Sequence, residues 1–135
     1  MIQRVQSVFL FLTFLLNGSV FFNALYQRAI EDPSQWIPIT FTAVLIVAAL
    51  FPLACIFLYN NRQIQLRFVN ISLLFNVVML GFGIGLFVTL GTLGNYLWKE
   101  AVGVGLILVA LIFQWYSQKK IKDDIELVNS MDRIR

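Results

Sequence analysis

The sequence has no histidine, only one cysteine and few charged residues, and these absences exclude several classes of function. No acidic residue interrupts its long apolar stretches, so the chain lacks the usual ligands for zinc, copper or an iron–sulfur cluster. The lone Cys55 has no partner for an intramolecular disulfide and behaves as a small hydrophobic residue. General acid–base chemistry would depend on carboxylates and lysines near the C-terminus alone. We therefore expect no enzyme activity and no bound cofactor.

Charged residues make up 13% of the 135 residues, whereas ordinary soluble domains carry roughly 25%. Hydrophobic residues make up 59%, and the mean hydropathy is +0.81. Four stretches contain no charge at all, namely 5–27, 33–61, 68–98 and 101–118. A soluble protein of this size has too little interior to bury four such stretches. The composition therefore predicts an integral membrane protein.

The charge-free stretches have the length that a membrane-spanning helix needs, which is about 20 residues for a hydrocarbon core of about 30 Å. Their apolar residues do not alternate with polar ones, which argues against a β-barrel. We predict an all-α protein, a four-transmembrane-helix bundle over residues 1–117 with spans near 5–25, 37–58, 68–90 and 96–115. The first span lacks a small-residue cleavage site and is predicted to be retained. Residues 118–135 form a cytoplasmic amphipathic C-terminal helix in this prediction.

The arginines and lysines are distributed unevenly between the two sides of these predicted spans. Only Arg28 and Lys99 fall on one side, and the positive-inside rule places the other, richer side in the cytoplasm. Both termini are then cytoplasmic. This arrangement accounts for the pI of 9.3 without a nucleic-acid partner. The eight residues on the cytoplasmic side are Arg4, Arg62, Arg67, Lys119, Lys120, Lys122, Arg133 and Arg135.

The start of the second span has two interpretations. Asp32 is suited to cap a helix that has Pro33 at its first position, but Pro38 then falls inside the first turns. Alternatively, the helix starts near Ile37 with Pro38 at its first position. The sequence leaves both open.

Several amides and small residues lie inside the predicted spans, where they favour helix packing over transport of ions. No charged side chain accompanies them, whereas ion and proton paths usually contain one. Asn17 and Asn76 both fall near mid-membrane and are the most favoured hydrogen-bonded pair. Pro52 is predicted to kink the second helix and to shape the packing. Candidate packing residues also include two small-xxx-small pairs, suited to contacts within the chain, in a homodimer or with another subunit: Gly81 with Gly85, and Ala101 with Gly105. These glycines lack the strand–helix context of a nucleotide-binding loop.

The C-terminal segment 118–135 is amphipathic at helical spacing. Its apolar residues, among them Ile125 and Val128, cover about half a turn. Such a helix either lies on the membrane surface, which is the favoured interpretation, or docks on a partner protein. Asp124, Asp132 and Arg135 fall on the apolar side and are candidates for polar contacts with a partner. The candidate cytoplasmic interaction residues are Arg62, Arg67, Ile125, Val128, Asp132, Arg133 and Arg135.

Three stretches resemble one family of small membrane proteins. They are the start Met1-Ile2-Gln3-Arg4-Val5-Gln6-Ser7-Val8, the loop 57–67 (FLYNNRQIQLR) and the end 121–135 (IKDDIELVNSMDRIR). The sequence is similar, from end to end, to domain of unknown function 4293, a set of four-helix membrane proteins of Bacteroidota. The resemblance implies a bacterial inner membrane. It brings no activity and no catalytic residues.

All three stretches fall on the predicted cytoplasmic side, which suggests contacts at that face. The leading hypothesis is a non-catalytic accessory or assembly subunit that packs against other membrane-protein subunits as well as membrane lipids. The alternative is a small homo-oligomeric carrier or channel for an apolar or neutral solute. Neither hypothesis involves a nucleotide or a nucleic acid.

Overall fold

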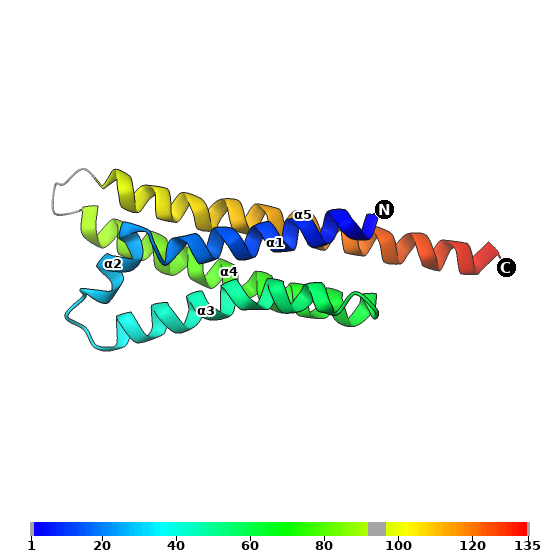
Figure 1. Ribbon diagram of the computed structural model, residues 1–135, viewed down its shortest axis with the longest axis horizontal. Coiled ribbons are helices and arrows are strands. Elements are labelled where there is room, and N and C mark those ends of the chain that lie inside the picture. The colour runs from blue at the N-terminus through cyan, green and yellow to red at the C-terminus, as the bar shows by residue number, and fades with distance from the viewer. Residues whose placement is uncertain (1, 92–96, 135) are drawn as a thin grey trace.

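The part of the chain that the structure describes forms five α-helices, and the all-α prediction is confirmed (Figure 1). The computed structural model describes the backbone of residues 2–91 and 97–134 and the side chains of residues 5–89 and 97–134. Within these ranges the chain has no strand. The helices are α1 (Ile2–Val20), α2 (Ala24–Ile30), α3 (Trp36–Phe57), α4 (Arg62–Gly91) and α5 (Trp98–Ile134).

The four long helices pack side by side, with α1 and α4 at opposite corners. Both α3 and α5 pack against α1 and against α4. The N-terminus and the α3–α4 turn lie at one end of the bundle, beyond which α5 continues (Figure 1). We call it the tail end, and we call the opposite end, where α2 lies, the α2 end.

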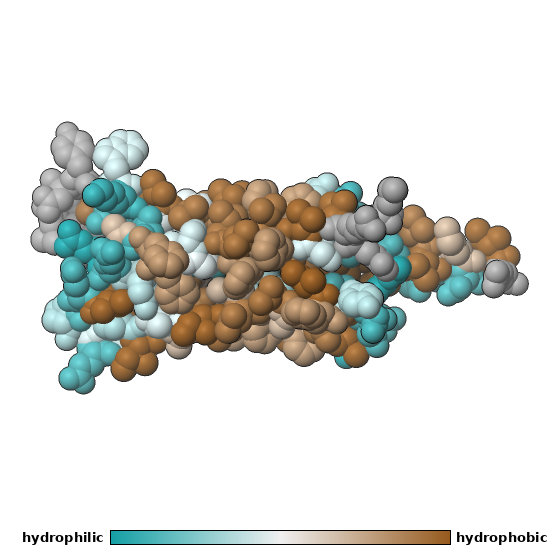
Figure 2. All heavy atoms as spheres, in the orientation of Figure 1, coloured by the Kyte–Doolittle hydropathy of each residue, from teal (hydrophilic) through white to brown (hydrophobic). Residues whose placement is uncertain are grey.

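Three helices, α3, α4 and α5, are long and apolar enough to cross a membrane. The pair α1 and α2 also qualifies if the two are counted as one bent span. On the face that Figure 2 shows, apolar residues form a belt across the middle of the bundle, with polar residues gathered toward both ends of it. Large apolar side chains exposed on this belt include Ile46, Leu74 and Ile112. The sequence-predicted stretches 37–58, 68–90 and 96–115 overlap these three helices closely.

The first predicted span, 5–25, is not one straight helix. Helix α1 ends at Val20, and α2 leaves it at an angle of 54°. The break is stabilised by Asn23, whose Oδ1 accepts a hydrogen bond of 2.9 Å from the backbone N–H of Leu25 and so caps α2. Asparagine favours this cap position over a helix interior, because its side chain competes for backbone hydrogen bonds. Asn23 therefore ends the straight part of the span, a role that apolar length alone does not reveal.

A glycine on α5 makes room for this break. A Cβ atom at Gly103 would lie 2.5 Å from Asn23 Oδ1 and 2.8 Å from Leu25 Cβ. The cap of α2 therefore rests directly on the backbone of α5, where only glycine fits. Gly105, two residues later, has no described atom of another residue within 4 Å of the corresponding position.

Helix α3 begins at Trp36, which agrees with the alternative that places its start near Ile37. Pro38 is its third residue, where a missing N–H costs no helical hydrogen bond. Asp32 does not cap this helix. It accepts hydrogen bonds from the hydroxyl and the backbone N–H of Ser34, and these two bonds hold the pKa of the Asp32 carboxyl below its usual range.

The predicted amphipathic tail is helical, but no break separates it from the last span. Helix α5 has 37 residues and runs without interruption through residue 118 (Figure 1). Ile121 is buried and Ile125 packs beside it, so the first part of the tail belongs to the bundle. Residues 126–134 are all exposed. A tail that lay on the membrane surface would need a bend after the span, and α5 does not have one.

Replacing Gly103 with alanine is expected to destabilise the protein by about 1–3 kcal/mol, because the new methyl group displaces the Asn23 cap or forces α5 away. The free energy of unfolding in mixed micelles measures the effect. Gly105→Ala is the matched control and should be neutral or slightly stabilising. Equal losses in the two variants would contradict the close approach at Gly103.

Candidate functional site

Three fully buried amide side chains meet at the centre of the bundle, one from each of α1, α4 and α5. Asn17 Nδ2 donates to Asn76 Oδ1 at 2.9 Å. Asn76 Nδ2 in turn donates to Gln114 Oε1. The structure thus brings together the pair that the sequence favoured, across the diagonal of the bundle, and adds Gln114. We call these three residues the amide layer.

The amide layer is tied to the fourth long helix through a proline. Asn17 Nδ2 also donates to the backbone carbonyl of Ala48 on α3, at 3.0 Å. In a regular helix this carbonyl would accept from the N–H of the residue four positions later, which here is Pro52 and has none. Asn17 therefore satisfies the carbonyl that Pro52 leaves free. A polar residue opposite a span proline is a signal that sequence analysis can look for, although it does not identify the partner.

Apolar residues enclose the amide layer on both sides. On α1, α4 and α5, each amide of the layer falls between one residue of a tail-end cluster and one residue of an α2-end cluster. The tail-end cluster consists of Leu10, Cys55, Val69 and Ile121. The α2-end cluster includes Val20, Leu45, Met79 and Ile107. Polar groups in this position are shielded from water, so their hydrogen bonds matter more than those at a surface.

The glycines of the predicted small-residue pairs face away from the described helices. A methyl group at Gly81, Gly85 or Gly105 would meet no described atom within 4 Å, so the structure gives no support to the within-chain alternative at these glycines. Ala101 is half-buried. The packed glycines are Gly83, whose added Cβ would lie 3.4 Å from Ile107, and Gly103. The packed glycines stand two positions after the first residue of each predicted pair, Gly83 after Gly81 and Gly103 after Ala101. Helices α4 and α5 therefore bury a different face from the one that carries the predicted pairs.

Gly81 and Gly85 instead line an open, mainly apolar groove of about 560 Å³. The groove runs along α4 and is flanked by Trp36 and Ile37 of α3. Contact of these glycines with a second copy or with another subunit stays a prediction.

At the tail end, the α3–α4 turn and α5 form a cleft of about 330 Å³. Arg62 Nη1 lies 3.0 Å from Asp124 Oδ2 and joins the two sides. Asp124, which the sequence offered as a partner contact, is therefore paired within the chain. The cleft is rich in amide side chains and is lined by Asn60, Asn61, Arg62, Gln63, Ile125, Val128 and Asn129.

This tail-end cleft draws together stretches that are far apart in the sequence. Its lining comes from the stretches 57–67 and 121–135. The third stretch, at the N-terminus, is joined to α5 by a hydrogen bond of 3.3 Å from Ser117 Oγ to the backbone carbonyl of Gln6. Arg67, Asp132 and Arg133 are exposed and do not line it. Arg135 lies outside the described residues.

The amide layer consists of neutral side chains, and the tail-end cleft is lined mostly by amides. Among the described residues, no group of three His, Cys, Asp or Glu side chains is placed to hold a metal ion. Amides are neutral at every physiological pH and act by hydrogen bonding alone. At the α2 end, Glu100 of α5 is nearly buried and lies 3.5 Å from Arg28 of α2, a pair that fixes α2 on the bundle.

The coupling between Asn17 and Pro52 is open to a double-mutant cycle. Asn17→Leu should lower the free energy of unfolding by about 1–2 kcal/mol, because it leaves Ala48 O without a donor. In a Pro52→Ala background the helix supplies that donor, and the cost of Asn17→Leu should fall by about 1 kcal/mol. Asn70→Leu, at an exposed amide, should be additive with Pro52→Ala. Additivity for Asn17 as well would refute the link.

Comparison with known proteins identifies the family without identifying an activity. No curated protein and no solved structure matches the chain. The resemblance carried by the three stretches at residues 1–8, 57–67 and 121–135 is confirmed over nearly the whole length. The match covers residues 2–134, and the chain belongs to the family described as domain of unknown function (DUF4293).

Proposed function

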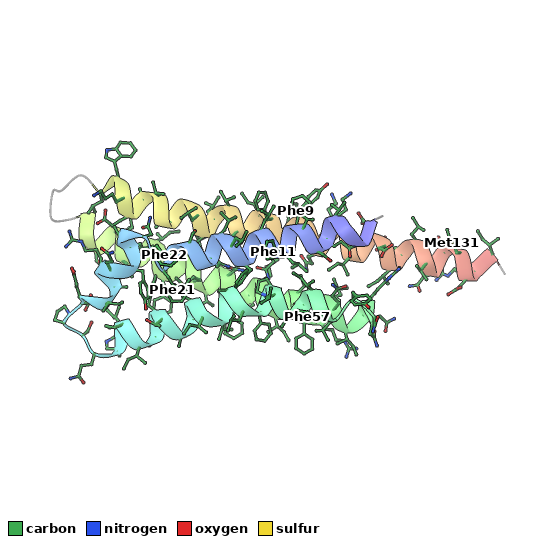
Figure 3. All side chains as sticks on the ribbon, in the orientation of Figure 1. Phe9, Phe11, Phe21, Phe22, Phe57 and Met131 are labelled. Atoms are coloured by element: carbon green, nitrogen blue, oxygen red, sulfur yellow. The ribbon has the colours of Figure 1, made fainter. Side chains whose placement is uncertain are left out.

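We propose that this protein is a non-catalytic accessory or assembly subunit of a larger complex in a bacterial inner membrane. The observation that carries the proposal is the projecting end of α5. The C-terminal end of α5 continues beyond the other helices, as Figure 3 shows at Met131. Leu127, Met131 and Ile134 are 47%, 61% and 87% exposed.

These three side chains fall at positions i, i+4 and i+7, which places them on one stripe of the helix. A stripe of large apolar side chains left in water is unfavourable, and such exposed apolar surfaces often mark interaction sites. Docking against another protein covers the stripe without bending α5. Membrane-surface binding would require the bend that α5 lacks, so the partner interpretation of the tail is better supported.

The tail-end cleft extends this surface toward the bundle. Its amides offer both donors and acceptors, which suits an irregular or extended backbone segment of a partner. The Arg62–Asp124 pair holds the root of the tail against the α3–α4 turn. The direction of the projecting helix is therefore fixed before any partner binds, which lowers the entropy cost of binding.

The proposal includes four spans with both termini in the cytoplasm. The bent pair α1 and α2 serves as the first span. The tail end carries Arg62, Arg67 and the basic residues of α5 after residue 118, whereas the α2 end carries Arg28 and Lys99. By the positive-inside rule, the tail end then faces the cytoplasm, and the docking surface is cytoplasmic.

A homo-oligomeric carrier or channel for an apolar or neutral solute is the alternative function. The open apolar groove beside Gly81 and Gly85 favours it, because apolar molecules in a membrane have access to such a groove. The two apolar clusters argue against a path through the bundle interior, since they close the amide layer on both sides.

The double variant Leu127→Asp with Met131→Asp tests the accessory role. It should abolish recovery, in mild detergent, of a partner that co-purifies with the wild-type chain at fixed stoichiometry. The variant itself should stay as stable as the wild type, because both side chains are exposed. Glu126→Gln with Ser130→Ala, on the polar side of the same segment, is the matched control and should retain the partner. A lone homo-oligomer from the wild-type chain would favour the carrier instead.

The topology is tested by cysteine labelling in a Cys55→Ala background. Ile30→Cys, which is 49% exposed at the α2 end, should react with an impermeant reagent in intact spheroplasts. Ser130→Cys, in the exposed tail, should react only after the membrane is permeabilised. The reverse pattern would overturn the orientation.

A further inference from the structure

We propose that the amide layer is an occluded binding site for water, held between the two apolar clusters. The inference rests on three buried polar groups that have no partner among the described residues: the two free ends of the amide layer, and a hydroxyl one helical turn from its central member Asn76. They are Asn17 Oδ1 on α1, Ser72 Oγ on α4 and Gln114 Nε2 on α5. All three residues are 0% exposed.

A count of donors and acceptors in the amide layer shows why these groups lack a partner. Asn17 Nδ2 uses both of its hydrogens, on Ala48 O and on Asn76 Oδ1, so the oxygen of the same amide still needs a donor. Gln114 Oε1 accepts from Asn76, so Gln114 Nε2 still needs an acceptor. The chain of amides thus ends in an acceptor on one side and a donor on the other.

Ser72 lies one helical turn from Asn76, toward the tail end, and its hydroxyl serves as both donor and acceptor. The site therefore combines one acceptor, one donor and one group that is both. Buried polar groups left in this state are costly in a protein interior, and more so where lipid surrounds the bundle.

The mixture of donor and acceptor selects the occupant. A cation is disfavoured by the Gln114 N–H, and an anion by the Asn17 carbonyl oxygen, with no charged residue in the layer to offset either. A neutral molecule that both donates and accepts fits, and the enclosure favours the smallest one. Buried waters typically make two to four hydrogen bonds to such groups.

The enclosure also distinguishes the layer from an open polar surface. On α4, Val69 precedes Ser72 and Met79 follows Asn76, each in one of the two clusters. On α5, Ile107 and Ile121 flank Gln114 in the same way. Gln6 Nε2 is also unpartnered, but it lies on the tail side of Leu10 and outside the layer. Water in the layer should therefore exchange slowly with bulk water.

The test is nuclear magnetic resonance of the full chain in lipid nanodiscs. Dipolar cross peaks between water and the Gln114 Nε2 protons, with the sign of long-lived water, are expected. The methyl groups of Met79 and Leu45, in the α2-end cluster, serve as controls and should show none. Absence of a water cross peak at Gln114 would overturn the proposal. Equal cross peaks at Met79 and Leu45 would also overturn it, because a generally wet interior is not a site.

Thermal unfolding of Ser72→Ala gives an independent readout. A hydroxyl that binds water in the layer contributes to stability, so its removal should lower the Tm. A dry hydroxyl without a partner is a liability, so its removal would leave the Tm unchanged or raise it, which would count against the site. Ser130→Ala, at an exposed position in the tail, is the control and should not change the Tm.

Discussion

The hydrogen bond between Asn17 and the carbonyl of Ala48 is the interaction on which the rest of the bundle depends. Pro52 creates the need for it by removing a helical donor, and α1 supplies the replacement across the core. The same amide group reaches Asn76, and through it Gln114, so one side chain fixes the relative positions of all four long helices. Apolar packing alone specifies such positions poorly in a membrane, because lipid tails are as apolar as the helices.

Much of this arrangement could be predicted from the sequence, because long apolar stretches without charge predict helices that are able to cross a membrane. The all-α class and the pairing of Asn17 with Asn76 both follow from such reasoning. The break at Asn23 did not, since apolar length does not distinguish a straight span from one interrupted by a capping residue. Which glycines pack against another helix could not be predicted either, because a small-xxx-small spacing does not indicate which face another helix covers.

The tail shows a different limit of sequence reasoning. A change in composition at residue 118 suggested a separate element, yet helix formation depends on the backbone and does not stop where polarity changes. The ion pair between Arg62 and Asp124 explains why an acidic residue stands on the apolar side of the segment. The charge of Asp124 pairs with Arg62 at the chain's own α3–α4 turn. Helical periodicity identified Asp124 as an exception on the apolar side, but it could not identify Arg62 as the partner.

The interactions that hold the helices together lie apart from the surface that the protein exposes at its tail end. The amide layer lies at the centre of the bundle and the Arg28–Glu100 pair lies at the α2 end, and both connect helices to one another. The stretches that carry the family resemblance gather at the tail end, around a cleft and a helix whose described residues 126–134 are all exposed. Under the proposed accessory role, a bound partner would cover the apolar stripe of Leu127, Met131 and Ile134 on the projecting part of α5. The bundle would then serve as the base that sets the direction of α5.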